Sequence, residues 1–354
     1  MRDAPVWFLV PGDPDTPTGG FVYDRYAVQG LAGAGRLGGV LRVDGRFPAT
    51  DADTLARSAE AVAGVPDGAI LVVDGLAFAP LVESLRPHAG RLTLVALVHH
   101  PLGDETGITD AERARWLRDE VAALRPVRRI VTTSRTTARR LAELGLDPGR
   151  IRAVPPGVDG PIDLSFRRPP AADAPLRLLT VATLIPRKGQ DLLVDALARL
   201  QDRPWTADLV GDARHPAFAR AVAGRIGELG LGDRIALRGA VRHDDLDRYW
   251  RAADLFVLPS RHEGWGIAYV EAVRWGLPVI GTSAGAIPEA VPAGAGVLVP
   301  PDDLEALTAA LARLLDDRAA FARLAVGAVA AAAGLRRWID TEREFVAAVT
   351  EGPP

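Results

Sequence analysis

Several residue types are scarce or missing in this chain. It contains no cysteine and no asparagine, one methionine at position 1, and a single lysine, Lys188, among 42 basic residues. Without cysteine the chain cannot form disulfides, thiolate zinc sites, iron–sulfur clusters or a cysteine nucleophile. A coding bias toward arginine explains the average composition, but it does not explain why position 188 keeps a lysine.

Long apolar runs and a large excess of one charge are also missing. The net charge is −3, which gives no electrostatic reason to expect nucleic acid as the main partner. The weakly polar stretches at 69–82 and 325–335 are interrupted or shorter than the roughly 18 residues that span a bilayer. The apolar run at 6–10 is too short for the core of a signal peptide. We therefore expect a soluble cytoplasmic protein.

The 354 residues are 48% hydrophobic and alternate short apolar runs with longer amphipathic ones. This alternation is typical of βα units and parallel sheets. Predicted strands fall into two series, at 6–10, 40–43, 69–73, 92–98, 130–133 and 151–154, and at 176–181, 207–210, 235–237, 255–258 and 279–281. A proline-rich segment between the series predicts a linker. The length also favours two domains, at roughly 100–200 residues per domain.

We predict an α/β chain with two Rossmann-like, doubly wound parallel-sheet domains that face one another across a cleft. The N-terminal domain is expected at 1–160, the linker at 161–175 and the C-terminal domain at 176–335. The last segment, 336–354, is expected to be a helix that packs back onto the N-terminal domain.

Three motif matches do not fit their usual surroundings. Residues 33–38 match GxGxxG, but they end a helical stretch instead of following a strand, so a helix end and turn is favoured over a dinucleotide site. The alternative that the protein is an NAD-dependent oxidoreductase depends on this motif alone. Residues 281–285 match the nucleophile elbow, but no histidine follows Ser283, as a hydrolase requires. His262 lacks a second histidine four residues on, and we predict no metal site.

Three other segments suit a ligand that carries a diphosphate. The Thr-Gly-Gly segment at 18–20 follows the first predicted strand and opens a helix, whose free amides favour an anion. Arg187 and Lys188 follow the strand at 176–181, which places two cations at a carboxyl strand edge, although a solvated turn explains them equally well.

The segment 259–272 is the most informative in the chain. Glu263 and Glu271 flank a Gly-Trp-Gly turn at 264–266 that predicts the start of a helix, where free amides again suit a phosphate. At a rise of about 1.5 Å per helical residue, the two carboxylates lie roughly 10 Å apart or more. That separation is wide for a glycosidase pair and suits two ends of one extended ligand.

These residues resemble the donor-site motif of the retaining glycosyltransferases of family 4, which have the GT-B fold. Glu263 and Glu271 are followed by Gly-Leu-Pro at 276–278 and by Gly-Ala-Ile-Pro-Glu at 285–289. Further matching segments run through nearly the whole chain, at 18–20, 98–100, 133–134, 156–159, 188–189, 210–212 and 253–260. The order and spacing of these segments together carry the resemblance.

The resemblance implies a retaining glycosyltransferase that moves a sugar from a UDP-, GDP- or ADP-sugar to a small-molecule, lipid or glycan acceptor, without a metal or other cofactor. It implies catalytic roles for His99, Glu263 and Lys188. Lys188 is expected to hold the diphosphate, Glu263 the transferred sugar and Glu271 the ribose. The implied donor site comprises Gly19, Gly20, Arg187, Lys188, Gly211, Val241, Glu263, Gly264, Trp265, Gly266 and Glu271. One departure is Thr183, where the family usually has the arginine of a Gly-Arg-Leu motif, and Arg187 is a candidate to supply that charge.

The acceptor side is less specific. Candidates in loops that resemble the family's acceptor cleft are Tyr23, Arg25, His100 and Asp104, each of which a solvated or capping role explains as well. Residues 111–152 hold eleven arginines against five acidic residues. This surplus suits a peripheral contact with an anionic membrane, although a solvated helical face explains it better.

Two other functions stay open from the sequence. One is a non-catalytic nucleotide- or carbohydrate-binding partner of a larger synthase, which Thr183 favours weakly and Lys188, Glu263 and Glu271 disfavour. The other is a nucleotide-sugar epimerase on the same fold.

Overall fold

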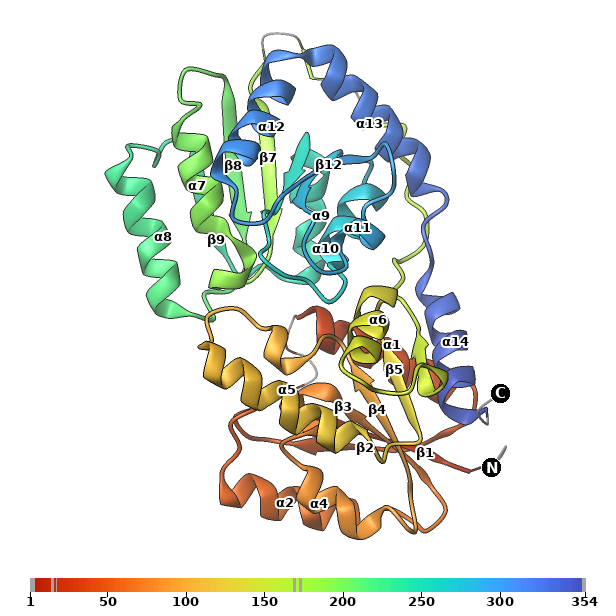
Figure 1. Ribbon diagram of the computed structural model, residues 1–354. Helices are drawn as coiled ribbons and strands as arrows, with labels where there is room; N and C mark the ends of the chain where they lie inside the picture. Colours follow the sequence, from red (N-terminus) through yellow and green to blue (C-terminus); the bar gives the residue numbers. More distant parts are fainter. Residues whose placement is uncertain (1–3, 14–15, 17, 168–169, 172–173, 352–354) are drawn as a thin grey trace. The chain divides into compact units, whose positions relative to one another are not determined.

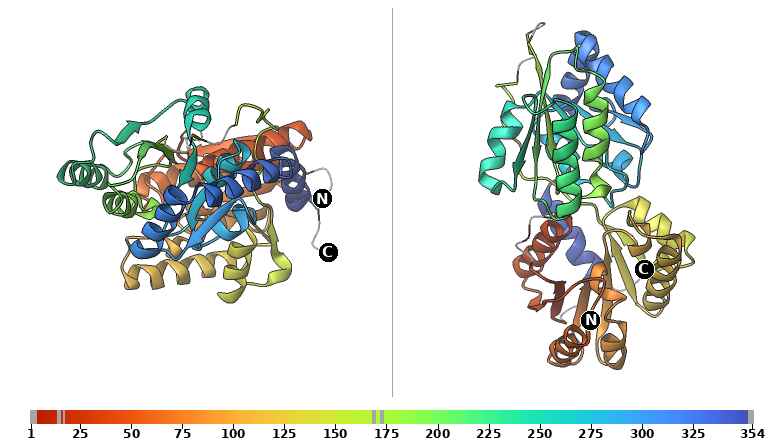
Figure 2. Two further views of the ribbon diagram at one scale, coloured as in Figure 1. Left: turned by 90° about the horizontal axis from the view of Figure 1, so that it is seen from above. Right: turned by 90° about the vertical axis from the view of Figure 1, so that its left-hand side faces the viewer.

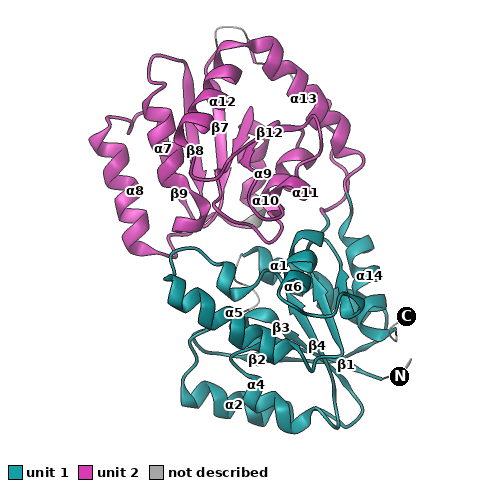
Figure 3. Ribbon diagram, in the orientation of Figure 1, with its two compact units in different colours: residues 1–157, 336–354 teal, residues 158–335 magenta. Residues whose placement is uncertain are grey.

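The computed structural model describes residues 4–13, 16, 18–167, 170–171 and 174–351. The chain divides into two compact units, one of residues 1–157 with 336–354 (unit 1) and one of residues 158–335 (unit 2), which Figure 3 colours separately. The sequence-based boundaries lie close to these, with the predicted linker at 161–175 inside unit 2. Residues 168–169 and 172–173 of that linker lie outside the described residues.

Unit 1 is built on a six-stranded sheet with the order β2-β1-β3-β4-β5-β6, and each pair of neighbouring strands is parallel. The strands are β1 (Val6–Pro11), β2 (Leu37–Val43), β3 (Ile70–Asp74), β4 (Thr93–Val98), β5 (Arg129–Thr132) and β6 (Ile151–Ala153). The strand order reverses between β1 and β3. In doubly wound sheets, ligands bind beyond the carboxyl ends of the strands at such a reversal.

Helices cover both faces of this sheet (Figures 1 and 2). They are α1 (Gly19–Gly33), α2 (Ala52–Ala63), α3 (Gly75–Phe78), α4 (Val82–Leu85), α5 (Asp110–Leu124), α6 (Arg135–Glu143) and α14 (Trp338–Thr350), with short 3-10 turns η1 (Arg86–His88), η2 (Leu102–Asp104) and η3 (Pro148–Arg150). On one face, Leu71 and Val73 of β3 pack with Val62 of α2, Leu85 of α4 and Leu124 of α5. Alternate strand residues face opposite sides of the sheet, so both faces of β3 are apolar.

The C-terminal helix α14 belongs to unit 1. The ring of Trp338 stacks on Tyr26 of α1 with centroids 4.1 Å apart, and Phe345 lies 6.1 Å from Phe8 of β1. Thr341 Oγ1 donates a hydrogen bond to the Pro155 carbonyl at 2.8 Å. The end of the chain therefore completes the core on the second face of the sheet.

Unit 2 also has a six-stranded parallel sheet, with the order β12-β11-β10-β7-β8-β9. Its strands are β7 (Leu176–Val181), β8 (Trp205–Val210), β9 (Ile235–Gly239), β10 (Leu255–Val257), β11 (Val279–Thr282) and β12 (Gly296–Val299). This is the Rossmann order, which reverses between β7 and β10.

Two layers of helices enclose the sheet of unit 2. They are α7 (Gln190–Ala198), α8 (Pro216–Glu228), α9 (His243–Ala252), α10 (Ile267–Arg274), α11 (Ile287–Ala290), α12 (Leu304–Asp316) and α13 (Arg318–Ala332), with the 3-10 turn η4 (Pro186–Lys188). Leu178 of β7 packs with Leu193 of α7 and Leu311 of α12 on one face. Its neighbour Leu179 packs with Val273 of α10 on the other face.

The predicted parallel sheets are confirmed, and every predicted strand overlaps a strand of the structure. The GxGxxG match at 33–38 covers the end of α1, the predicted turn and the first two residues of β2, so it does not follow a strand. The strand β12 was not predicted, because its four-residue run lies among glycines and prolines that indicate a loop. No helix in the described part of the chain is both long and apolar enough to cross a membrane.

Candidate active site

Most of the predicted site residues of unit 2 follow β7 or β10, the strands at which the strand order reverses. Lys188 is the last residue of η4, after β7. Gly189 follows with a φ of 69°, and a Cβ at this position would collide with the carbonyl oxygen of Pro259. Glycine therefore lets the turn after β7 come close to the segment after β10, which carries Glu263.

Glu263 lies at the centre of a buried cluster of charges. Its Oε1 is 2.6 Å from Lys188 Nζ and accepts a hydrogen bond of 2.6 Å from Ser260 Oγ. Its Oε2 is 3.1 Å from Nη1 of Arg187. Glu263 itself is only 5% exposed. The structure thus brings together three of the residues predicted for the donor site, Arg187, Lys188 and Glu263.

The electrostatics of this cluster favour the ionised carboxyl. Burial alone raises the pKa of Glu263, but the charges of Lys188 and Arg187 outweigh it and lower this pKa to about 2. One carboxylate and two cations leave a surplus of one positive charge. Such a surplus at the carboxyl edge of a doubly wound sheet suits an anionic ligand.

The Gly-Trp-Gly turn leads into α10 as predicted. Gly266 caps the helix with a left-handed φ of 96°, and a Cβ there would lie 2.6 Å from Cδ2 of Tyr269. Trp265 is half-buried, and its buried indole N–H has no hydrogen-bond partner among the described residues. The backbone amides at the start of α10 and the indole N–H of Trp265 can therefore donate hydrogen bonds to a ligand at the predicted site.

The remaining donor-site candidates lie around the same sheet. Glu271 is on α10, where its Oε2 pairs with Nη1 of Arg274 at 3.2 Å. Gly211 follows β8 and donates a backbone hydrogen bond of 2.9 Å to the Gly239 carbonyl. Val241 lies between β9 and α9 and packs against the core. Thr183, at the family's arginine position, accepts a hydrogen bond from Gln190 through its carbonyl.

In unit 1, Thr18 caps α1, and Gly19 and Gly20 are its first two residues, as predicted. A Cβ at Gly20 would lie 3.6 Å from the ring of His99, so the helix start lies directly against this ring. His99 follows β4, and its carbonyl accepts hydrogen bonds from the hydroxyls of Thr133 and Thr137 at 3.1 and 3.2 Å. The backbone of His99 is therefore fixed beside the start of α1.

Two aspartates face the side chain of His99. Its Nε2 lies 3.0 Å from Oδ2 of Asp74 and 3.4 Å from Oδ1 of Asp24. Burial lowers the pKa of His99, but hydrogen bonds and charges of the two aspartates outweigh it and raise this pKa to about 10. Burial and the charge of Asp74 raise the pKa of Asp24 to about 7. These are the only three described residues grouped closely enough to form a candidate metal-ligand set.

Asp74 is a site residue that was not predicted from the sequence, and neither was the contact of Asp24 with His99. The available signal was the position of Asp74 at the end of a buried strand, where the carboxyl edge of the sheet begins. The contact itself depends on β3 and β4 being neighbours, which the pattern of apolar residues does not determine.

The acceptor-side candidates occupy different environments. Tyr23 is fully buried, and its hydroxyl donates to the Val154 carbonyl at 2.9 Å, so the expectation that it faces an acceptor is wrong. Its ring belongs to the core between α1 and α14. Arg25 is exposed on α1. Nε2 of His100 lies 3.4 Å from Oε2 of Glu105.

The loop after β4 is fixed by α5 and α6. Asp104 forms two hydrogen bonds with Arg140, at 3.1 and 3.2 Å, so it has a structural partner within unit 1. Oε2 of Glu120 accepts the Leu102 N–H at 2.9 Å. Burial raises the pKa of Glu120 to about 8.

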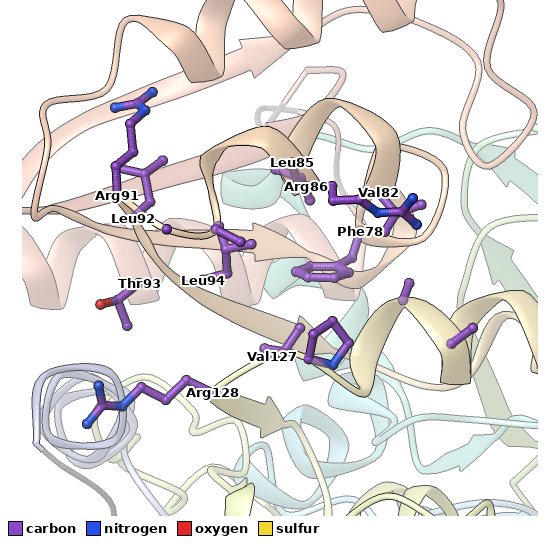
Figure 4. Close-up of a pocket in the computed structure, with 15 residues that line it drawn as sticks. Phe78, Val82, Leu85, Arg86, Arg91, Leu92, Thr93, Leu94, Val127 and Arg128 are labelled. Atoms are coloured by element: carbon purple, nitrogen blue, oxygen red, sulfur yellow. The ribbon is translucent and has the colours of Figure 1, made fainter.

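A separate pocket lies at the opposite edge of the unit 1 sheet. Thr93 and Leu94, the first residues of β4, line it together with Phe78, Val127 and Arg128 (Figure 4). His99 follows the other end of the same strand. This pocket is therefore distinct from the predicted site.

Comparisons with known proteins agree with these observations. Residues 70–160 match the family described as Glycosyltransferase Family 4, and residues 175–317 match the one described as Glycosyl transferases group 1. The lipopolysaccharide core biosynthesis mannosyltransferase LpsB of Rhizobium meliloti (strain 1021) is 40% identical over 177 residues, which are 47% of this chain and 48% of LpsB. The chain thus spans about half the length of this curated relative.

Solved structures show the same fold. Sucrose-phosphate synthase from Thermosynechococcus elongatus has a TM-score of 0.78 at 23% identity, covering 97% of both chains. HepE of Anabaena, solved in complex with UDP and glucose, has a TM-score of 0.75 at 20% identity, covering 97% of this chain and 98% of HepE. Two doubly wound units and these likenesses identify the GT-B fold. The two family matches, on successive parts of the chain, confirm the predicted resemblance to glycosyltransferase family 4.

Proposed function

We propose that this protein is a glycosyltransferase that takes a sugar from a nucleoside diphosphate sugar and transfers it to an acceptor with retention of configuration at the anomeric carbon. The observation that carries the proposal is the cluster of Arg187, Lys188 and Glu263. It lies where strand order reverses in unit 2, and it has a surplus of one positive charge.

The cluster suits the diphosphate of the donor. Breaking the bond to the sugar leaves a nucleoside diphosphate, whose growing negative charge must be stabilised more than it must be protonated. Charge-assisted hydrogen bonds contribute about 1.5–3 kcal/mol each. Lys188 and Arg187, held by Glu263 at 2.6 and 3.1 Å, are already ordered before a ligand arrives. Little side-chain entropy is then lost on binding.

The same inventory supports a reaction without a metal cofactor. Two side-chain cations and the amides at the start of α10 supply the charge stabilisation that a divalent ion provides in other transferases. Retention is the stereochemistry of the family that the sequence resembles. Product configuration, read from the anomeric proton coupling by NMR, and activity in excess EDTA test these two parts of the proposal.

Binding of the donor is tested by thermal shift with UDP, GDP, ADP, dTDP and their sugars. A ligand at 100 times its dissociation constant adds about 2.7 kcal/mol to stability, so one nucleoside diphosphate is expected to raise the melting temperature clearly. Lys188→Met is expected to weaken that binding roughly 10- to 100-fold, which corresponds to the loss of one charge-assisted hydrogen bond.

The comparison uses the ligand-induced shift of each variant, because Lys188→Met also removes a partner of buried Glu263. Arg220→Met, at an exposed position on α8, serves as the matched loss of a cation and should keep the full shift. The proposal would be contradicted if none of the nucleotides or nucleotide sugars raised the melting temperature. Binding without any release of nucleoside diphosphate in the presence of acceptors would favour a non-catalytic partner of a synthase.

A further inference from the structure

The cluster of His99, Asp24 and Asp74 lies at the strand-order reversal of unit 1. Asp74 is the last residue of β3, Asp24 is in the second turn of α1 after β1, and His99 follows β4. Both aspartates are buried, with exposed fractions of 1% for Asp24 and 3% for Asp74. The side chain of His99 is 20% exposed. Of these three side chains, therefore, that of His99 is the one that reaches the surface.

The cluster contains more hydrogen-bond acceptors than donors. Oδ1 of Asp74 accepts the N–H of Leu76 at 2.7 Å as the cap of α3, and its Oδ2 faces His99 Nε2 at 3.0 Å. Both oxygens of Asp24 are buried, and the described group nearest to its Oδ1 in an ion pair is the same nitrogen, at 3.4 Å. Buried carboxylates require a compensating charge, and the imidazole of His99 is the group placed to carry it.

Every element packed against His99 supports this assignment. Helix α1 contributes Asp24 and the edge of the Tyr23 ring, whose centroid is 5.6 Å away. Strand β3 contributes Asp74. Thr133, which follows β5, and Thr137 of α6 contribute hydroxyls that donate to the backbone carbonyl of His99. No described cation faces the ring to oppose its protonation.

We propose that Asp24 and Asp74 are positioning residues that hold His99 as a fixed imidazolium, so that His99 acts as a charged hydrogen-bond donor to anionic oxygens of a bound ligand and not as a base. This inference rests on the proposed function for the identity of that ligand, a phosphorylated sugar donor. An imidazolium has two N–H donors and no acceptor. With Nε2 turned to the aspartates, Nδ1 is the remaining donor for the ligand.

The same three residues also form a possible ligand set for a divalent cation. The number of ligands does not separate the two cases, because water completes many three-residue zinc sites and most magnesium sites. However, the two nearest candidate ligand atoms, Nε2 of His99 and Oδ2 of Asp74, already face one another as a hydrogen-bonded pair at 3.0 Å. The adjacent walls are the glycine at position 20 and the ring of Tyr23. The observations therefore favour a charged histidine over a metal centre, and the experiment below separates the two.

The direct test is an NMR titration of the histidine ring carbons in the full-length, ligand-free protein. The signal of His99 is assigned by its loss in His99→Gln. In the wild type, His99 is expected to stay protonated from pH 6 to pH 9. Asp74→Asn removes the nearer charge while the asparagine still caps α3, and it should lower the His99 midpoint by roughly 1–3 units. Asp24→Asn should lower it in the same direction.

Glu105→Gln is the matched control, because Glu105 faces the neighbouring His100 and not His99. It should leave the His99 titration unchanged. A wild-type His99 that titrates near its ordinary pKa would overturn the proposal without the need for any variant. A midpoint that neither aspartate substitution moves would also overturn it. Stabilisation of the wild type by Mn²⁺ or Zn²⁺ that Asp24→Asn abolishes would replace it with a metal site.

Kinetics then distinguish positioning from a purely structural role. In Asp74→Asn, the transfer rate should fall about tenfold per pH unit above the lowered His99 midpoint, while the wild-type rate shows no such fall up to pH 9. The thermal shift with nucleoside diphosphate should survive in this variant, because Lys188 and Arg187 belong to unit 2. If the proposed function is wrong, nucleoside diphosphate does not raise the melting temperature of the wild type. If only this inference is wrong, that thermal shift is present but the His99 titration midpoint does not move in the aspartate variants.

Discussion

Glu263 keeps its negative charge in a buried position because two cations and a hydroxyl surround it. Its pKa falls from the ordinary 4.5 to about 2. A lowered carboxyl pKa contributes stability that is complete above the unfolded-state pKa and is lost as the pH falls through the folded-state value. At 1.36 kcal/mol per unit, the contribution is about 3 kcal/mol above pH 5 and disappears toward pH 2.

We therefore expect Glu263→Gln to lower the free energy of unfolding by roughly 3 kcal/mol at pH 7, because it also leaves Lys188 and Arg187 without their buried counter-charge. Urea unfolding at pH 7 and at pH 3 measures the effect, and the difference from wild type should shrink at the lower pH. Glu305→Gln is the control, since Glu305 pairs with Arg199 on the surface, where ion pairs contribute about 0–1 kcal/mol. Equal losses in both variants would contradict this account of Glu263.

At the residue scale, some site residues could be predicted from the sequence, but their contacts could not. Lys188 stands out as the only lysine, and Glu263 precedes a recognisable turn and helix start. Their contact was not predictable, because it depends on β7 and β10 being neighbours. Tyr23 was misassigned because an aromatic residue on a helix near a loop can face either the core or solvent, and only the return of α14 places it in the core.

At the scale of elements, glycine has opposite effects in two helices of unit 2. Gly189 begins α7 with a left-handed φ, against the Pro259 carbonyl. Gly224 lies in the middle of α8 and is exposed, and a Cβ added at this position would meet no atom within 4 Å. The first glycine is required by its conformation, whereas the second only weakens its helix.

Gly189→Ala is accordingly expected to destabilise the protein by at least 1–2 kcal/mol, roughly the cost of a left-handed L-residue, with further loss from the collision. Gly224→Ala should stabilise it by about 1 kcal/mol through helix propensity. Urea unfolding monitored by circular dichroism checks both values. Changes of the same sign in the two variants would show that the backbone conformation at 189 does not matter in this way.

Elements with clear ends were predicted best. The strand at 176–181 has the predicted bounds, because it is a buried apolar run that follows a proline-rich segment. The order of the strands in each sheet could not be predicted from the sequence, because apolar patterning indicates which residues are buried but not which strands are adjacent. The order in unit 1 is what places Asp74 next to His99, so this part of the site could not be predicted.

For the whole molecule, the division into units follows spatial packing and not only chain order. Residues 336–354 join unit 1, where Trp338 and Phe345 are buried against α1 and β1. Burying large aromatic side chains contributes about 1.5–3 kcal/mol each. Unit 1 without α14 therefore loses a substantial part of its stability, since a domain has only about 5–15 kcal/mol in total.

This packing leads to a prediction about separated units. The backbone of Arg337 lies directly against Gly157, so residues 1–157 can be joined to 336–354 through a short glycine linker, and residues 158–335 can be produced alone. The joined unit 1 is expected to unfold cooperatively, while residues 1–157 alone should not, because the core around Phe345 stays open.

The isolated 158–335 fragment should still bind the nucleoside diphosphate, since Arg187, Lys188, Glu263 and Glu271 all belong to it. Thermal melting and NMR spectra of the three fragments check folding, and calorimetry checks nucleotide binding. Cooperative unfolding of residues 1–157 without α14 would show that the last helix is dispensable for this core, and loss of nucleotide affinity in the 158–335 fragment would mean that the donor's main contacts come from both units.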